Sequence, residues 1–173
     1  IDRSLVGSEM CIRDRDYVWR MAEHKAKTAL HNALQTDLAT QFDNLITLGS
    51  DTIGEINGEV LVKPKDFEDF KRMMKMMSNN SHYVHTAVAI CFDHRMESQV
   101  VTAEVEFGKL TDKDIEWYWN TGEPQDKAGG YAIQGLAGQF VKQVKGSYSA
   151  VVGLPLYETV NMLKKAGICV HEC

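Results

Sequence analysis

LGSDTIGEINGEVLVKP, residues 48–64, is the stretch that decides the fold. The apolar run of residues 45–48 leads into it and ends at a glycine, which predicts a buried strand. Asn57 and Gly58 then stand between β-prone residues, and this dipeptide is the strongest short signal for a hairpin turn. Lys63 is followed by Pro64, which holds the lysine backbone in an extended conformation. The stretch therefore predicts a strand and a hairpin, with the next element beginning at Pro64.

Helices are predicted on both sides of this stretch. Upstream, small and apolar residues after Asp16 recur near one face, which predicts an amphipathic helix of about five turns with Asp16 as its N-cap. Downstream, Asp66 and Asp69 have the spacing of a capping box, and apolar residues come after them at intervals of three and four up to Met77. The strand and hairpin are thus expected to lie between two amphipathic helices.

The rest of the chain alternates between strand-like and helix-like sequence patterns. In residues 84–92 and 100–107 the side-chain character alternates and β-branched residues are frequent, so both segments are predicted as strands. Thr111 begins a predicted helix, residues 137–144 are a predicted strand, and Pro155 opens a last helix. Helices interleaved with strands predict an α/β fold with a mixed twisted sheet and flanking helices.

Length and composition favour one soluble domain. The chain has 173 residues and a formal net charge of −5, so it lacks the basic surface that general nucleic-acid binding requires. No apolar run approaches the roughly 20 residues of a membrane span. The four cysteines have no zinc-site spacing, and a reduced, cytoplasmic protein is expected. We therefore expect neither nucleic acid nor membrane among its partners.

Residues 1–15, IDRSLVGSEMCIRDR, differ in character from the rest of the chain. Their apolar residues recur with no clear period and offer little apolar surface to bury. Most of these residues resemble a translated adapter sequence. We therefore expect a non-native leader over residues 1–15 and a single domain over residues 16–173.

Asp51 and Lys63 are the first candidates for chemistry. Asp51 lies just past a predicted strand, where a carboxylate can hold a divalent metal or take a proton from water. Its position alone fits equally well a loop aspartate that accepts local N–H groups. Lys63 precedes a predicted helix N-terminus, which favours an anion site, although a solvated surface lysine has the same pattern.

A glycine-dense segment, residues 129–138, provides the remaining candidates. Glycines let backbone approach a ligand closely, yet the Walker lysine is absent, so this is not a P-loop. Lys127 beside the segment could contact phosphate, and the amide of Gln134 could pair with a base edge. His82 and His85 would point to opposite faces of a strand, which argues against a shared metal.

The order and spacing of these motifs resemble the Maf family of nucleoside triphosphate pyrophosphatases. The likeness runs over residues 17–168 and includes, besides residues 48–64, the segments 82–86, 121–124, 126–129, 131–135 and 152–155. The resemblance implies a Maf/ITPase-like architecture. It also implies hydrolysis of a nucleoside triphosphate to the monophosphate and pyrophosphate.

The resemblance assigns roles to individual residues. Asp51 would be the general base or a metal-linked carboxylate, with Mg²⁺ or Mn²⁺ as the divalent cation. Lys25, Lys63 and Lys127 would neutralise the triphosphate, Lys25 because residues 23–26 match the Lys-Ala step of the family. The family habit implies a homodimer.

Thr52 and Gln134 indicate the branch of the family. They resemble the dTTP/UTP branch, whereas the 7-methyl-GTP branch tends to have Gln and Glu at these places. Three alternatives stay open: the 7-methyl-GTP branch itself, a non-catalytic nucleotide-binding module that affects cell division, and a structural fragment without function.

One part of the family pattern has no counterpart in the sequence. The family opens with a strand and a Ser-x-Ser-Pro-Arg-Arg loop, and neither is found here. We expect the 173-residue chain to be weak or inactive for this reason, and to have an exposed sheet edge.

Overall fold

The computed structural model describes residues 3–37, 41, 45–92 and 95–170, with side chains from Asp14 onward. Its centre is a five-stranded sheet in the order β2-β1-β3-β4-β5, and every described strand pair is antiparallel. The strands are β1 (Thr47–Ile56), β2 (Glu59–Leu61), β3 (Ser81–Phe92), β4 (Arg95–Phe107) and β5 (Val141–Lys145).

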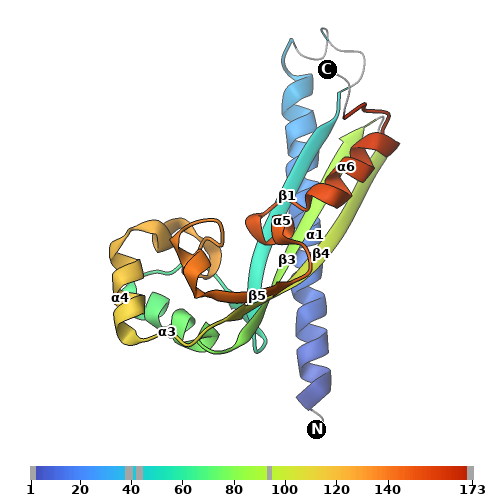
Figure 1. Ribbon diagram of the computed structural model, residues 1–173. Coiled ribbons are helices and arrows are strands. Elements are labelled where there is room, and N and C mark those ends of the chain that lie inside the picture. Colours follow the sequence, from blue (N-terminus) through green and yellow to red (C-terminus); the bar gives the residue numbers. More distant parts are fainter. Residues whose placement is uncertain (1–2, 38–40, 42–44, 93–94, 171–173) are drawn as a thin grey trace.

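Helices cover both faces of this sheet, as Figure 1 shows. The long helix α1 packs on one face of the long strands, and α6 packs on the opposite face. The other helices, apart from the short α5, form a lobe at one end of the sheet. The helices are α1 (Arg3–Leu34), α3 (Phe67–Met77), α4 (Asp112–Asn120), α5 (Tyr148–Val152) and α6 (Leu156–Lys165), with 3₁₀ turns η1 (Glu123–Asp126), η2 (Ala128–Gly130) and η3 (Leu136–Phe140).

The expected α/β fold with flanking helices is confirmed. Each face of the sheet has its own apolar contacts because successive strand residues point to opposite sides. Ala87 and Ala89 of β3 pack against α1, whereas Val88 and Ile90 pack against Met162 of α6. None of the helices in the described residues is long and apolar enough to cross a membrane.

The local signals in the central stretch are confirmed as well. Asn57 and Gly58 both have positive φ, 53° and 81°, and they join β1 to β2 as the hairpin prediction required. Asp66 caps α3 by accepting a hydrogen bond from the N–H of Asp69. Thr111 and Asp114 form a reciprocal capping box at the start of α4.

Several sequence-based boundaries are wrong. The strand expected to end at Gly49 continues to Ile56, so Asp51 lies within β1, paired with Ala87 of β3, and not just past the strand. Asp16 is not an N-cap, because α1 begins at Arg3 and runs through it; residues 3–15 contain no proline that would end the helix. The strand expected over residues 137–144 begins only at Val141, because residues 136–140 form the 3₁₀ turn η3. Hydrogen bonds with residues distant in the sequence stabilise that turn, and no local sequence pattern indicates them.

The outer edge of β1 is only partly covered. Its pairing with β2 involves Gly54, Glu55 and Ile56, while its pairing with β3 extends from Thr47 to Glu55. Among the described residues, β1 therefore has no strand partner on its outer side before Gly54. A ligand that reaches this edge can contact residues of either face.

Candidate functional site

Asp51 and Lys25 form an ion pair between β1 and α1. Lys25 Nζ lies 2.6 Å from Asp51 Oδ1 and also donates to the carbonyl oxygen of Ser50 at 2.9 Å. The Asp51 side chain is 17% exposed, and that of Lys25 is 49% exposed. The carboxylate is therefore held by a cation yet remains open to solvent and to a ligand.

A glycine makes this pairing possible. A Cβ at Gly49 would overlap the carbonyl oxygen of Ala22 and the backbone nitrogen of Ala26, both in α1. The helix thus approaches the strand more closely than any side chain at position 49 would allow. Because Gly49 and Asp51 are two residues apart in β1, both face α1, and the close approach brings Lys25 alongside Asp51.

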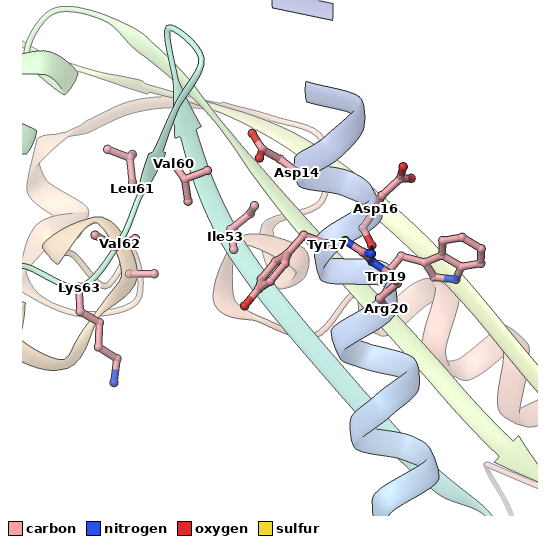
Figure 2. A pocket seen from close by; sticks show the side chains of 11 residues that line it. Asp14, Asp16, Tyr17, Trp19, Arg20, Ile53, Val60, Leu61, Val62 and Lys63 are labelled. Carbon is pink, nitrogen blue, oxygen red and sulfur yellow. Dashed lines mark hydrogen bonds between the residues drawn. The ribbon is translucent and has the colours of Figure 1, made fainter. Parts of the chain in front are cut away.

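A cavity of about 810 Å³ opens between α1 and the β1–β2 hairpin. Figure 2 shows Tyr17 reaching from α1 toward β1, with Lys63 on the opposite wall. Arg20 also lines this cavity, as does Ile53, which shares the α1-facing side of β1 with Asp51. The cavity therefore has two cationic side chains, with Asp14 and Asp16 also in its lining, and Ile53 places it two residues along β1 from Asp51.

Thr52 points to the other face of the sheet. Its hydroxyl lies 2.9 Å from the hydroxyl of Thr86, which donates to the carbonyl oxygen of Ala150 at 2.7 Å. Since each hydroxyl has one proton, Thr52 donates to Thr86 in this arrangement. The lone pairs of Thr52 remain available as acceptors.

A smaller cavity of about 180 Å³ lies beside Thr52. Lys127 and Gln134 line it, together with the buried ring of Tyr131. Leu61 and Ala128 line both cavities, so the two meet at β2 and η2. The second cavity has the volume of a base rather than of a whole nucleotide.

The six residues expected from the sequence thus divide into two groups. On the α1 side, Lys25 touches Asp51, and Lys63 lines the adjoining large cavity. On the other side, the remaining residues line the small cavity together: Thr52, Lys127 and Gln134. The neighbours Asp51 and Thr52 belong to different groups, which the two-residue period of a strand makes predictable.

Sequence reasoning missed Tyr17 and Arg20 on the large cavity, and Glu123 behind the small one. The Glu123 carboxylate accepts hydrogen bonds from the N–H groups of Leu136 and Ala137, next to Gln134. A glutamate within residues 121–124 was part of the family resemblance, but no local pattern connects it with a segment thirteen residues away.

The two buried histidines lie on opposite faces of β3, as expected. Burial lowers the pKa of His82 to about 4, and its Nε2 lies 2.6 Å from the hydroxyl of Tyr131. Burial, with the charge of Arg15, lowers the pKa of His85 to about 4. A shared metal is excluded for this pair because the sheet separates the two rings.

Among the described residues, no three metal-ligating side chains of His, Cys, Asp or Glu gather into one group. Asp51 is the carboxylate paired with Lys25 beside the large cavity, whose own lining includes Asp14 and Asp16. A single carboxylate fits a magnesium-like ion, which keeps much of its shell from water and substrate phosphates. It does not fit a dedicated protein cage for a transition metal.

The structure is an α/β protein with a large cleft lined by both cationic and acidic side chains, beside the Asp51–Lys25 ion pair. The chain belongs to the Maf-like protein family, whose model matches residues 6–166. It is 48% identical over 157 residues to a dTTP/UTP pyrophosphatase of Pseudoalteromonas atlantica (strain T6c / ATCC BAA-1087), covering 91% of this chain and 79% of that one.

Two further relatives have the same description. The dTTP/UTP pyrophosphatase of Colwellia psychrerythraea (strain 34H / ATCC BAA-681) is 49% identical over 154 residues, covering 88% of this chain and 70% of the relative. That of Vibrio vulnificus (strain YJ016) is 49% identical over 148 residues, covering 86% of this chain and 75% of the relative. The similarity therefore extends over most of both chains.

Proposed function

We propose that this protein is a nucleoside triphosphate pyrophosphatase that hydrolyses dTTP and UTP to the monophosphate and pyrophosphate. The observation that carries the proposal is the Asp51–Lys25 pair at the edge of a cavity lined by Lys63. Relatives described as dTTP/UTP pyrophosphatases, at 48% and 49% identity, support the choice of substrate.

The α1 side of β1 suits the triphosphate. Lys63 and Arg20 line the large cavity together with Asp14 and Asp16, and Lys25 lies beside it in a chain whose net charge is −5. Local cations of this kind can concentrate a polyanion even on an acidic protein. Arg20 is an additional cationic side chain beyond those that we expected from the sequence to neutralise the triphosphate.

The opposite side of β1 suits the base. Thr52 presents acceptor lone pairs, and Gln134 has both a donor and an acceptor in its amide. Neutral groups of this kind match the edge of uracil or thymine, which offers both carbonyl oxygens and an N–H. Because β1 has no described outer partner before Gly54, one nucleotide can contact both sides around this edge.

The reaction is a displacement at the α-phosphorus. Water attacks that phosphorus, and the bond to the oxygen that bridges to the β-phosphorus breaks. Asp51 takes the proton from water, and pyrophosphate leaves while the cations stabilise its charge. The contact with Lys25 holds the carboxylate in one orientation for this transfer.

A divalent cation, Mg²⁺ or Mn²⁺, is part of the proposal. Asp51 would hold it together with phosphate oxygens of the nucleotide, and it would neutralise charge that develops on the phosphates. Lys127, which lines the small cavity, would complete the neutralisation from the other side.

The family resemblance supports two finer proposals, a homodimer and a cytoplasmic location. The partly covered outer edge of β1 is a surface that a second chain or a bound segment could protect. Light scattering over a range of protein concentrations tests the dimer, and a constant monomer mass would contradict it.

A pyrophosphate-release assay tests the activity directly, on the 173-residue chain and on the same chain extended by the family's N-terminal strand and Ser-x-Ser-Pro-Arg-Arg loop; we expect the unextended chain to be weak or inactive. The panel should contain dTTP, UTP and 7-methyl-GTP, with Mg²⁺ or Mn²⁺ present. We expect dTTP and UTP to be preferred, and we expect Asp51→Asn to abolish turnover while dTTP binding persists. Faster hydrolysis of 7-methyl-GTP would overturn the substrate choice. In the extended chain, nucleotide binding without any pyrophosphate release would favour the non-catalytic module.

A further inference from the structure

The segment that carries Gln134 is tied down at its N-terminal end by Tyr118. The backbone N–H of Ala132 donates to the Tyr118 hydroxyl at 3.2 Å. Tyr118 is fully buried in α4, packed between the rings of Phe70 and Phe140. Its hydroxyl is therefore a fixed point to which the start of the segment is attached.

Glu123 ties down the other end of the same segment. Its carboxylate accepts hydrogen bonds from the N–H of Leu136 at 3.0 Å and from that of Ala137 at 3.4 Å. The Tyr118 hydroxyl also donates to it, at 2.7 Å. Burial raises the pKa of Glu123, but the hydrogen bonds from Leu136, Tyr118 and Ala137 outweigh this effect and lower it. The group is thus a carboxylate that accepts three donors.

Gly135 shows how tightly this carboxylate fits the segment. A Cβ at position 135 would overlap both carboxylate oxygens of Glu123. Gln134 lies immediately before this contact, exposed to solvent and lining the small cavity. The segment therefore has little room to shift without breaking a hydrogen bond at one of its ends.

We propose that Tyr118 and Glu123 are positioning residues that hold Gln134 in the orientation required for nucleotide recognition. This inference rests on the proposed function, since it concerns the same nucleotide site. Neither residue lines either cavity, so both act through the segment of residues 132–137 rather than by touching the nucleotide. The hydrogen bonds at both ends restrict the backbone on either side of Gln134, which lowers the entropic cost of ordering it on binding.

Glu123→Gln tests this inference with a minimal change of shape. The glutamine amide would present a donor to N–H groups that are themselves donors, so at least one hydrogen bond is lost. We expect the Kd for dTTP to rise roughly tenfold, as loss of a charged hydrogen bond would allow. Hydrogen exchange at the amides of Leu136 and Ala137 should accelerate in the same variant.

A double substitution separates positioning from general destabilisation. Gln134→Ala alone should raise the Kd for dTTP to a similar extent. If Glu123 acts through Gln134, adding Glu123→Gln to that variant should cause little further loss, because coupled residues are non-additive. Tyr118→Phe, which removes only the hydroxyl, should behave like Glu123→Gln. Full additivity of the two losses would overturn the inference.

Glu104→Gln is the matched control. Glu104 is a partly buried glutamate on β4 that pairs with Lys145 at 3.2 Å, outside both cavities. It should leave both dTTP affinity and exchange at Leu136 unchanged; an equal loss of affinity in this control would also overturn the inference. Wild-type dTTP binding is measured first: if it fails, the proposed function fails, whereas normal wild-type binding with an unaffected Glu123→Gln refutes the positioning role alone.

Discussion

The two faces of β1 differ in the chemistry that they present. The face toward α1 has charged groups, with Asp51 and Lys25 in contact and a large cavity beside them. The opposite face has the neutral hydrogen-bonding groups Thr52 and Gln134, with Lys127 beside them, around a cavity less than a quarter as large. The strand β1 therefore separates the Asp51–Lys25 pair, which we propose for the chemistry, from Thr52 and Gln134, which we propose for base recognition.

Residues that are adjacent in the sequence need not belong to the same part of the candidate site. Asp51 and Thr52 are adjacent, yet their side chains meet α1 and α5 on opposite sides of the sheet. Substitutions on the α1 face should therefore change turnover, and substitutions on the other face should change nucleotide affinity or preference.

The largest expected effect comes from filling the contact between α1 and β1. Gly49→Val would place side-chain atoms where backbone atoms of Ala22 and Ala26 now lie. Because backbone cannot move aside as a flexible side chain can, we expect a loss of about 4 kcal/mol of unfolding free energy and nearly all activity. Urea unfolding and pyrophosphate release measure these two effects. Gly108→Ala, at a site where an added Cβ meets only an ordinary contact at 3.7 Å, is a mild comparison that should retain activity.

Acidification should destabilise both faces through their buried histidines. The folded-state pKa values of His82 and His85 are about 4, below the ordinary value of 6.5. Between these values the unfolded chain binds more protons, so stability is fully present above pH 6.5 and is lost as pH falls toward 4. The loss is on the order of 3 kcal/mol at most for His82.

Arg15 should distinguish the two histidines. Its charge contributes to the low pKa of His85 but has no such part in that of His82. An NMR titration of Arg15→Gln should therefore show a higher pKa for His85 and an unchanged pKa for His82. Equal shifts of both histidines would contradict the separation of the two faces.

Lys25→Met should lower turnover with a smaller effect on stability. The substitution keeps an unbranched side chain in α1 but removes the cation 2.6 Å from Asp51. We expect kcat for dTTP to fall roughly tenfold, a cost of about 1.4 kcal/mol, because the carboxylate loses its orientation. Lys27→Met, on the same helix and more exposed, is the matched control, and an equal loss there would refute a specific role for Lys25.

The smallest effect is expected at Thr86. Thr86→Val removes the hydroxyl that accepts from Thr52 and donates to Ala150, so the Thr52 hydroxyl can reorient. We expect the Kd for UTP to rise by roughly threefold, with kcat nearly unchanged. Thr86→Ser restores the hydroxyl and should restore the affinity. A failure of serine to do so would show that packing, not the hydroxyl, matters at this position.

Local signals made much of the fold predictable. The turn at Asn57 and Gly58 and the caps at Asp66 and Thr111 depend on residues within a few positions of each other, and these predictions are confirmed. The strand expected over residues 137–144 was wrong because its first half is held by Glu123, thirteen or more residues away. The periodicity of apolar residues cannot indicate a hydrogen bond between residues so far apart in the sequence.

The sequence supplied the candidate residues of the site, whose roles are proposals, but not their arrangement. Family resemblance selected Lys25 and Asp51, and the structure places them in contact. The two cavities could not be predicted, because each is formed by elements far apart in the chain, such as α1 with Lys63. The separation of Asp51 from Thr52 could have been predicted from the alternation of side chains along a strand.

A paired kinetic measurement tests the division between the faces most directly. Steady-state turnover of dTTP and the Kd for dTTP would be measured for wild type, Asp51→Asn and Gln134→Ala under one set of conditions, each in the chain extended by the family's N-terminal strand and loop. We expect Asp51→Asn to lose roughly a thousandfold or more in kcat with little change in Kd, and Gln134→Ala to weaken binding with kcat within a few-fold of wild type. If both variants lost kcat equally at unchanged affinity, the two faces would not have separate roles and the account would be wrong.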